Sequence, residues 1–355
     1  MDAFYTDDFL AETMGFYFPD FEKEKIRILE PSVGTGNLLS EIFKKYQNKN
    51  VTIDVFDINK SVLKNLKKSL KNIPENFKIN YFCENFLEHN FRSNYDLVVA
   101  NPPFSLARDF LEKCLTIGEK ISIIMPKTFL SSTKFARTRE FIENIEIENI
   151  IDFGERGFCD AKIETICLFL DIKSTPNERQ KYITDKKFPY WLIYRDEIFD
   201  GLADKMEFDI FKEYRDRDLK NELLSKERTN EKNIWVLRSR NVTENDLKHI
   251  DGYDRYISKK DLEGTKAIKF LNREVFLAPI LTEKIRVIKK PKNVVCNGSV
   301  AFLVPKDGVK ISEKDLEYFK SEEFRKFYDI ATNKSTRTKN IDKNSVYFFG
   351  RKNEK

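Results

Sequence analysis

The sequence predicts an α/β fold with a mostly parallel sheet, followed by a smaller α+β domain. Three observations support this prediction. Short apolar runs alternate with segments of helical periodicity between residue 26 and about residue 170. Helical connections of roughly 10–15 residues between such runs are typical of right-handed βαβ crossovers, which make successive strands parallel. Beyond residue 171 the alternation ends and the composition becomes polar, which indicates a different second domain.

Seven apolar runs in the first part of the chain have the length and composition of strands. They occupy residues 26–30, 51–58, 77–82, 95–104, 120–126, 147–154 and 163–171. Helices are expected over 36–46 and 59–73. The last two runs are expected to add a late strand and an antiparallel partner, which gives a seven-stranded sheet.

The domain boundary is expected within the polar, proline-containing segment 171–180, so that 1–172 and 173–355 form separate domains. The second domain is expected to mix helix and strand. A charged helix is predicted at about 203–226, and strand-like runs lie at 233–237, 267–271 and 293–305.

Composition excludes several classes of protein. The chain has 355 residues, of which 41% are hydrophobic and 31 are Phe, so it has enough apolar material for packed cores and is not disordered as a whole. No apolar stretch approaches the roughly 18 residues of a membrane span, and the acidic start does not resemble a secretory signal. Five scattered Cys without a C-x-x-C pair fit a reduced cytoplasm, and only two His make a zinc site or a His-dependent hydrolase improbable.

The charge is distributed unevenly along the chain. Residues 1–170 carry 22 Lys and Arg against 26 Asp and Glu, a net charge of −4, whereas residues 171–355 carry 41 against 32, a net charge of +9. The second part is therefore expected to meet a polyanion such as a nucleic acid. The alternative is a solvated, Lys-rich surface with no partner.

A glycine-containing loop, Glu30-Pro31-Ser32-Val33-Gly34-Thr35-Gly36-Asn37, follows the first strand. Gly34 and Gly36 allow a sharp turn and a close approach of the backbone to a ligand, at the start of a helix. The loop is neither a dinucleotide fingerprint nor a phosphate loop. Glu30 suits a cationic ligand, and Asp57, at the end of the next strand, is placed to bind the two hydroxyls of a ribose. A structural turn and a solvated acid are the alternatives.

The segment Asn101-Pro102-Pro103-Phe104 follows the apolar strand that begins at residue 95. The two prolines fix the backbone and remove two N–H donors, so the Asn101 side-chain oxygen and the Pro102 carbonyl can both accept hydrogen bonds from one –NH2 group. An amino group conjugated to a ring is a poor nucleophile because its lone pair is delocalised. Two acceptors favour its pyramidal form and direct the lone pair toward an electrophile. Phe104 offers a face for a planar base, and the alternative is a simple strand-ending turn.

These motifs, in this order, resemble those of the amino-group methyltransferases that use S-adenosylmethionine, and most closely the DNA adenine-N6 enzymes of the γ class. The resemblance covers residues 4–170. It implies a Rossmann-like methyltransferase domain followed by a target-recognition domain, and methyl transfer to the N6 amino group of an adenine flipped out of duplex DNA. It also implies a place in a restriction–modification system, with a cognate restriction endonuclease as a partner and no membrane.

The resemblance assigns residues to roles. The catalytic set is Asn101, Pro102, Pro103 and Phe104. The cofactor-binding set is Phe4, Tyr5, Thr6, Glu30, Pro31, Ser32, Gly34, Gly36, Asp57, Ile58, Asn85 and Phe86. Asn85 departs from the family, which usually has Asp there to accept from an adenine amino group, but the Asn amide oxygen can still accept. Phe158 resembles the Phe that stacks on the far face of the flipped adenine, with core packing as the alternative.

Two basic runs in the second part are suited to phosphates. The first contains Lys284, Arg286, Lys289, Lys290 and Lys292, and the second contains Lys334, Arg337, Lys339 and Lys343. Either run can instead be a solvated face.

Two other functions use the same motifs. One is methylation of RNA adenine, of guanine N2 or of a protein glutamine amide. Against it, only 29 residues precede the cofactor loop that begins at Glu30, which leaves no room for the N-terminal substrate domain that the glutamine and guanine enzymes tend to have. A basic second part follows, where the DNA enzymes have their target-recognition domain. The other is a nucleic-acid-binding subunit that retains the fold without activity, which the intact motifs argue against. The recognition sequence and the oligomeric state are not predicted.

Overall fold

The computed structural model describes residues 6–70, 73–158, 163–176, 188–189, 197–228, 233–333 and 338–353. Contacts divide the chain into two compact units, residues 1–182 and 183–355. The predicted boundary after residue 172 lies ten residues before this division. Within the described residues, no helix combines the length and the apolar character that a membrane span requires.

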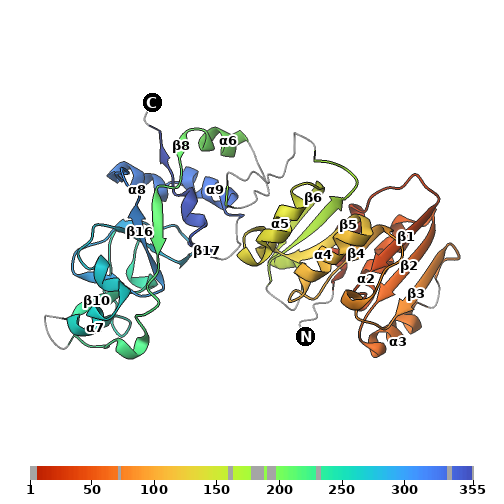
Figure 1. The fold of residues 1–355 in the computed structure, drawn as a ribbon, viewed down its shortest axis with the longest axis horizontal. Coiled ribbons are helices and arrows are strands. Elements are labelled where there is room, and N and C mark those ends of the chain that lie inside the picture. The colour runs from red at the N-terminus through yellow and green to blue at the C-terminus, as the bar shows by residue number, and fades with distance from the viewer. Residues whose placement is uncertain are drawn as a thin grey trace. The chain divides into compact units, whose positions relative to one another are not determined.

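The first unit is built on a seven-stranded sheet in the order β3-β2-β1-β4-β5-β7-β6 (Figure 1). Its strands are β1 (Lys25–Glu30), β2 (Asn50–Phe56), β3 (Phe77–Phe82), β4 (Tyr95–Ala100), β5 (Gly118–Pro126), β6 (Glu146–Gly154) and β7 (Thr165–Asp171). All neighbouring pairs from β3 to β5 are parallel, and β7 is antiparallel to both β5 and β6. The prediction of a mostly parallel seven-stranded sheet is confirmed.

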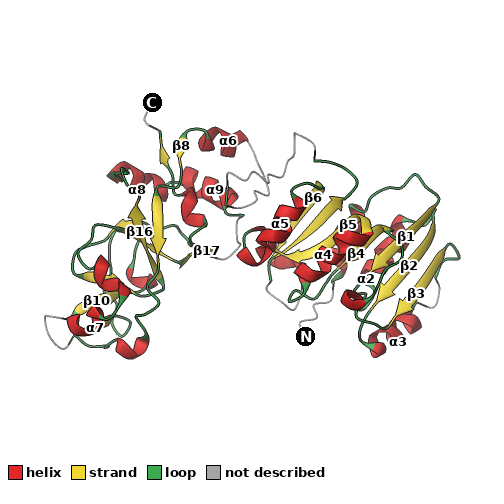
Figure 2. Ribbon diagram, viewed as in Figure 1, coloured by secondary structure: helices red, strands yellow, loops and turns green. Residues whose placement is uncertain are grey.

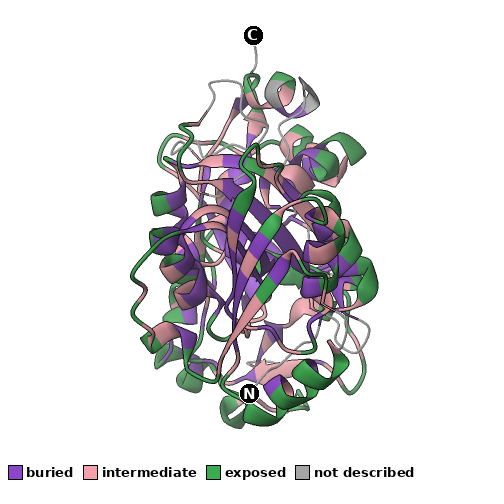
Figure 3. Cartoon of the chain, turned by 90° about the vertical axis from the view of Figure 1, so that its right-hand side faces the viewer, coloured by how far each residue is buried: buried purple, intermediate pink, exposed green. Residues whose placement is uncertain are grey.

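Helices flank this sheet (Figure 2). They are α1 (Asp8–Phe16), α2 (Asn37–Lys45), α3 (Lys60–Ser69), α4 (Ala107–Ile117) and α5 (Ala136–Ile142). Local signals set their starts: Asp7 accepts a hydrogen bond from the Leu10 amide at the start of α1, and Asn59 accepts one from the Ser61 amide at the start of α3. The strands form the buried centre, while outward faces of the helices are exposed (Figure 3).

Strand β4 shows why the site lies where it does. Its central side chains, from Leu97 to Ala100, are completely buried, as expected for a strand covered on both faces. The apolar run predicted for 95–104 ends as a strand at Ala100, because the prolines that follow cannot donate to a ladder. Asn101 therefore begins a loop at the carboxyl edge of the sheet.

The second unit is α+β. Its strands are β8 (Met206–Glu207), β9 (Phe211–Tyr214), β10 (Ile234–Leu237), β11 (Arg255–Ile257), β12 (Phe276–Pro279), β13 (Leu281–Thr282), β14 (Ile288–Lys289), β15 (Val294–Cys296), β16 (Val300–Pro305), β17 (Lys339–Asn340) and β18 (Arg351–Lys352). Its helices are α6 (Glu197–Ala203), α7 (Lys259–Glu263), α8 (Glu313–Lys320) and α9 (Glu322–Ala331). The larger sheets have the orders β14-β12-β16-β9 and β11-β10-β15, and Phe side chains from α8, α9 and the end of the chain fill one core.

Two expectations for the second unit were wrong, and two helices were missed. The segment 203–226, predicted as a charged helix, is mostly strand and loop. Phe211 is buried, and β9 pairs with β16 as an antiparallel strand. The predicted strand at 267–271 is a short 3-10 helix, whose buried residues Ala267 and Phe270 have helical spacing. Helices α8 and α9 were missed, although Ser312 and Ser321 cap their starts.

Candidate functional site

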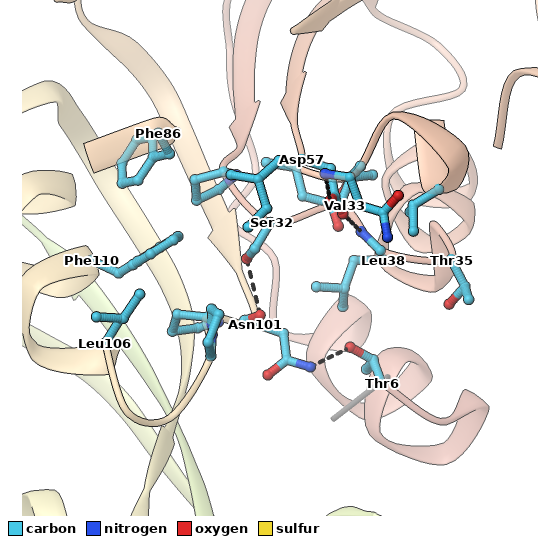
Figure 4. Close-up of a pocket in the computed structure, with 18 of the residues that line it drawn as sticks. Thr6, Ser32, Val33, Thr35, Leu38, Asp57, Phe86, Asn101, Leu106 and Phe110 are labelled. Atoms are coloured by element: carbon cyan, nitrogen blue, oxygen red, sulfur yellow. Dashed lines mark hydrogen bonds between the residues drawn. The ribbon is translucent and has the colours of Figure 1, made fainter. Parts of the chain in front are cut away.

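A pocket of about 630 Å³ opens at the carboxyl ends of the parallel strands of the first unit (Figure 4). It is lined by Thr6, Glu30, Pro31, Ser32, Val33, Gly34, Thr35, Asn37, Leu38, Asp57, Ile58, Asn59, Lys60, Val62, Glu84, Asn85, Phe86, Asn101, Pro102, Pro103, Leu106 and Phe110. This is the edge at which open α/β sheets bind ligands. Twelve of these residues were singled out from the sequence, and they come from five separate segments of the chain.

The glycine loop forms one side of the pocket. Gly34 and Gly36 have φ angles of 52° and 86°, in the left-handed region that side chains other than glycine rarely adopt. A Cβ atom on Gly36 would also lie 2.5 Å from Leu66 Cδ1, so this position requires glycine. Gly36 does not line the pocket. Its contribution is the turn that starts α2.

Glu30 lies at the end of β1, beneath this loop. Its side chain is only 1% exposed, and its Oε2 atom has no hydrogen-bond partner among the described residues. Burial and, to a lesser degree, the nearby Asp57 carboxylate raise the pKa of Glu30 well above its ordinary value. A buried carboxyl group with an unused oxygen that lines a pocket is suited to a cationic ligand group.

Asp57 follows β2 and is held by the backbone around it. Its two carboxylate oxygens accept hydrogen bonds from the amides of Gly34, at 3.3 Å, and Asn59, at 2.7 Å. These bonds tie the glycine loop to the start of α3. The neighbouring Ile58 also lines the pocket and is 53% exposed, so it offers an apolar surface beside the carboxylate.

Asn101 is anchored through both its side chain and its backbone (Figure 4). Its Nδ2 donates to Thr6 Oγ1 at 2.9 Å, and its carbonyl oxygen accepts from Ser32 Oγ at 2.9 Å. Figure 4 shows the side-chain oxygen on the other side of the amide from Thr6. Pro102 and Pro103 then carry the chain across the pocket, and the Pro103 carbonyl accepts from the Leu106 amide as α4 begins.

The 3-10 helix η1 (Phe86–Glu88) provides another wall of the pocket. Asn85 caps it by accepting from the Leu87 amide at 3.1 Å, so the oxygen expected to accept from an adenine amino group already binds the backbone. Its Nδ2 donates to Glu88. Phe86 is buried, and its ring centroid lies 5.0 Å from that of Phe110 on α4.

Lys113, on α4, holds η1 in place and was missed from the sequence. Its ammonium group donates to the carbonyl oxygens of Phe86, Leu87 and His89, at 2.7–2.8 Å. Nothing in the sequence pattern of α4 marks this lysine, because its partners lie more than 20 positions earlier. Among the lining residues missed were Leu106 and Phe110, which also lie on or next to α4.

Phe104 and Phe158 meet, but outside the set of residues that line the pocket. Their ring centroids are 5.6 Å apart at an interplanar angle of 72°, an edge-to-face contact. Phe158 is 6% exposed and joins the main core of the first unit. In this arrangement no parallel-walled slot exists between the two rings. Phe4 and Tyr5 lie outside the described residues, whereas Thr6 lines the pocket.

The structure changes the interpretation of the basic runs in the second unit. Lys284 pairs with Glu244, Lys289 with Glu274 and Lys339 with Asp329. Arg286 is half-buried and donates to the Val242 carbonyl, and burial lowers its pKa. Lys334 and Arg337 lie outside the described residues.

Lys290 is a correction to the predicted phosphate contacts. Its side chain is buried, and its ammonium group donates to the carbonyl oxygens of Leu271, Pro291 and Val294. To reach a phosphate, the Lys290 ammonium group would have to give up these three hydrogen bonds and disrupt the backbone that they hold together. We therefore assign Lys290 a structural role.

Comparison with known proteins finds a family and a curated relative that resemble parts of this chain. Residues 10–118 match the family described as methyltransferase small domain. The modification methylase CviBIII of Paramecium bursaria Chlorella virus NC1A is 24% identical over 214 residues, which cover 53% of this chain and 54% of that protein. The chain thus spans about half the length of this curated relative.

Solved structures with a similar fold include several methyltransferases. TrmK of M. capricolum, in complex with S-adenosyl-homocysteine, is 12% identical, with a TM-score of 0.36, and the match covers 50% of this chain and 74% of that one. A chain of a type I restriction–modification system is 14% identical, with a TM-score of 0.39, and the match covers 48% of this chain and 43% of that one.

The first unit has a Rossmann-like methyltransferase fold, and its cofactor is S-adenosylmethionine. The residues present fit this group. The buried Glu30 carboxyl group, with its unused Oε2, suits the ammonium group of the methionine part. The Asp57 carboxylate, next to the apolar Ile58, suits the ribose hydroxyls and the adjoining base.

Proposed function

We propose that this protein is a methyltransferase that transfers the methyl group of S-adenosylmethionine to the N6 amino group of a flipped-out adenine in duplex DNA. We further propose that it is the modification component of a restriction–modification system, with a cognate restriction endonuclease as its partner. One observation carries the proposal. Asn101 and Pro102 line the same pocket as Glu30 and Asp57. Residues suited to accept hydrogen bonds from an amino group therefore lie in the same pocket as residues suited to hold the cofactor.

The chain's own residues supply binding and orientation. When bound, S-adenosylmethionine supplies an electrophilic methyl group on a positively charged sulfur. Glu30 binds the ammonium group, and Asp57 binds the ribose hydroxyls. These contacts fix the position of the methyl group relative to Asn101, and such positioning is a large part of the rate enhancement available to a two-substrate reaction.

Asn101 and Pro102 activate the nucleophile. The Asn101 side-chain oxygen and the Pro102 carbonyl oxygen each accept a hydrogen bond from the adenine amino group. These two hydrogen bonds make the nitrogen lone pair available to the methyl carbon. The nitrogen gains the methyl group as the carbon–sulfur bond breaks, and it loses one proton to solvent. Preorganised acceptors of this kind act where positive charge develops on the nitrogen. Thr6 holds the Asn101 amide so that its oxygen lies on the side away from the Thr6 hydroxyl.

The adenine has to leave the base stack to reach Asn101, at a cost of a few kcal/mol. Phe104 follows the catalytic prolines and offers a stacking face that offsets part of this cost. Phe158 contacts the edge of Phe104. We propose that it closes on the base from the far side after a change of its side-chain rotamer.

DNA is proposed as the substrate for two reasons. The relative that matches over 214 residues is itself named a modification methylase. Residues 171–355 carry a net charge of +9, which suits a polyanion, and such an electrostatic contribution is large in DNA binding.

Nucleoside mass spectrometry tests the proposal. The protein is incubated with S-adenosylmethionine and either mixed-sequence duplex DNA or total RNA, with the Asn101→Ala variant as the matched control. N6-methyladenine in the DNA digest, absent with Asn101→Ala, is expected. Methylated nucleosides in the RNA digest alone would show that the substrate is RNA and not DNA. No mark in either, with the cofactor bound, would refute the nucleic-acid substrate.

A further inference from the structure

We propose that the loop between β10 and β11, residues 238–254, is a DNA-contacting surface whose cations are Arg238 and Arg240. The inference rests on the proposed function for the identity of the polyanion. We call this segment the arginine loop. It was not singled out from the sequence, which pointed instead to the basic runs that begin at residues 284 and 334.

The two arginines share one aromatic ring. Their guanidinium carbons lie 4.3 Å and 5.0 Å from the ring centroid of Tyr253. Neither guanidinium forms an ion pair with a carboxylate of the described residues, in contrast to Lys284 and Lys289. The loop therefore presents two cations that are oriented by an aromatic ring and not neutralised by a neighbouring acid.

A buried amide fixes the loop that carries these cations. Asn241 is 0% exposed and accepts from the Arg238 amide at 2.9 Å. Its Nδ2 donates to the Lys248 carbonyl oxygen at 3.0 Å and to Asp254 Oδ1 at 2.6 Å. One side chain thus joins the beginning, the middle and the end of the arginine loop. Because the backbone is fixed, less conformational entropy is lost when the arginines bind.

An aromatic stack in the same segment extends the surface. The ring centroids of His249 and Trp235, which belongs to β10, are 3.7 Å apart at an interplanar angle of 16°. His249 Nδ1 contacts Asp254 Oδ2 at 2.6 Å, which sets the orientation of the imidazole. The His249 side chain is 67% exposed, so its outer edge is available to a ligand.

The acids of the arginine loop do not neutralise the pair. Glu244 is engaged by Lys284 at 3.2 Å, and Asp254 is buried beneath His249 and Asn241. Asp246 and Asp251 are exposed, and neither forms an ion pair with Arg238 or Arg240 in the part of the chain that the structure describes. Guanidinium groups match phosphate oxygens and the acceptor edge of guanine in a two-pronged geometry, whereas an ammonium group acts as a point charge. Two oriented arginines beside an aromatic stack therefore suit the phosphates and base edges of a nucleic acid, and the proposed function makes duplex DNA the partner.

Fluorescence anisotropy with labelled mixed-sequence duplex DNA tests this surface on the full chain. The variant is Arg238→Gln with Arg240→Gln. The matched control is Lys310→Gln with Lys314→Gln, which removes the same charge from two exposed lysines of the same unit. We expect the arginine variant to raise Kd at least about tenfold and to reduce the salt slope by about 2, because two phosphate contacts are lost. The control should change Kd less than about twofold.

A third variant separates orientation from charge. Tyr253→Leu keeps both cations and removes the ring that orients them, and it should weaken binding about threefold with little change in the salt slope. Cofactor binding and the melting temperature of each variant show that the chain is folded. Wild-type affinity in the arginine variant, or an equal loss in the lysine control, would overturn the proposal. If the wild-type protein binds DNA through these arginines yet methylates neither DNA nor RNA, the surface stands and the proposed function fails.

Discussion

Replacing Glu30 by Gln should weaken cofactor binding and stabilise the free protein at the same time. The substitution keeps the shape of the side chain and removes its charge. Glu30 is 1% exposed, and its Oε2 has no partner among the described residues. Ionising such a group in the free protein is unfavourable, whereas the ammonium group of the cofactor requires the ionised form.

The magnitude for binding follows from the loss of one charge-assisted hydrogen bond. Such bonds contribute about 1.5–3 kcal/mol, so the Kd for S-adenosylmethionine should rise by a factor of ~10–150. The wild-type affinity should also depend on pH. Below the raised pKa of Glu30, its carboxyl group in the free protein carries a proton that has to leave before the cofactor binds. The Kd for S-adenosylmethionine should therefore rise about tenfold for each unit by which the pH is lowered below that pKa. The variant should lack this dependence.

Stability should change in the opposite direction. The pKa of Glu30 is about 4.5 in the unfolded chain and well above that in the folded protein. At pH values between these two pKa values, folding therefore takes up a proton at Glu30. The stability of the wild type falls as the pH rises through this range. Glu30→Gln removes that loss, so its melting temperature should exceed that of the wild type at pH 8, and the difference should shrink toward pH 4.5.

Two measurements over pH 5–8 check this reasoning: isothermal titration calorimetry with S-adenosylmethionine, and thermal unfolding with and without the cofactor. Adding a saturating cofactor should reverse the order of the melting temperatures, because it stabilises the wild type more. Unchanged affinity in the variant would show that Glu30 does not hold the ammonium group. A lower melting temperature of the free variant at pH 8 would show that the buried, ionised Glu30 does not destabilise the free protein.

Further predictions concern the catalytic loop and the second unit. Asn101→Ala should lower kcat at least about 100-fold, with the cofactor Kd unchanged within about threefold, whereas Asp57→Ala should mainly raise that Kd; single-turnover assays and calorimetry separate the two. Thr6→Val should lower kcat about fivefold, since one hydrogen bond of ~1 kcal/mol orients the Asn101 amide, and Thr6→Ser should retain activity; equal activity of both variants would exclude this role. Lys290→Met should lower the free energy of unfolding by about 2–4 kcal/mol in urea melts, because three buried carbonyl groups lose their donor. Lys292→Met, at an exposed position of the same run, should change it by less than about 0.5 kcal/mol.

The first unit could be predicted well because its signals are local. Its strands are apolar runs, and helices α2 and α3 start at recognisable residues, Gly36 and Asn59. The carboxyl ends of parallel strands meet at one edge, so the sequence alone predicts that Glu30, Asp57 and Asn101 converge. Lys113 could not be found in this way, because its role depends on carbonyl groups that the fold brings to α4.

The second unit was harder to predict for the opposite reason. Its strands are short, and whether a segment forms a strand depends on pairing with a distant part of the chain, as β9 pairs with β16. A run of basic residues in the sequence does not reveal that Lys290 turns inward. The pairing of Arg238 with Tyr253 joins positions 15 apart and depends on the buried Asn241, which no local pattern marks.

The hydrogen bond from Ser32 to the Asn101 carbonyl has a thermodynamic consequence. Ser32 belongs to the loop proposed to hold the cofactor, and Asn101 to the loop proposed to receive the target base, so a single hydrogen bond of 2.9 Å joins the two proposed binding sites. Through this bond, a displacement of the first loop is expected to move the backbone of the second. Any factor by which the cofactor alters the affinity for the base is then, by linkage, the factor by which the base alters the affinity for the cofactor. The two ligands of this pocket are thus expected to bind with a shared coupling free energy, which is measurable from either side.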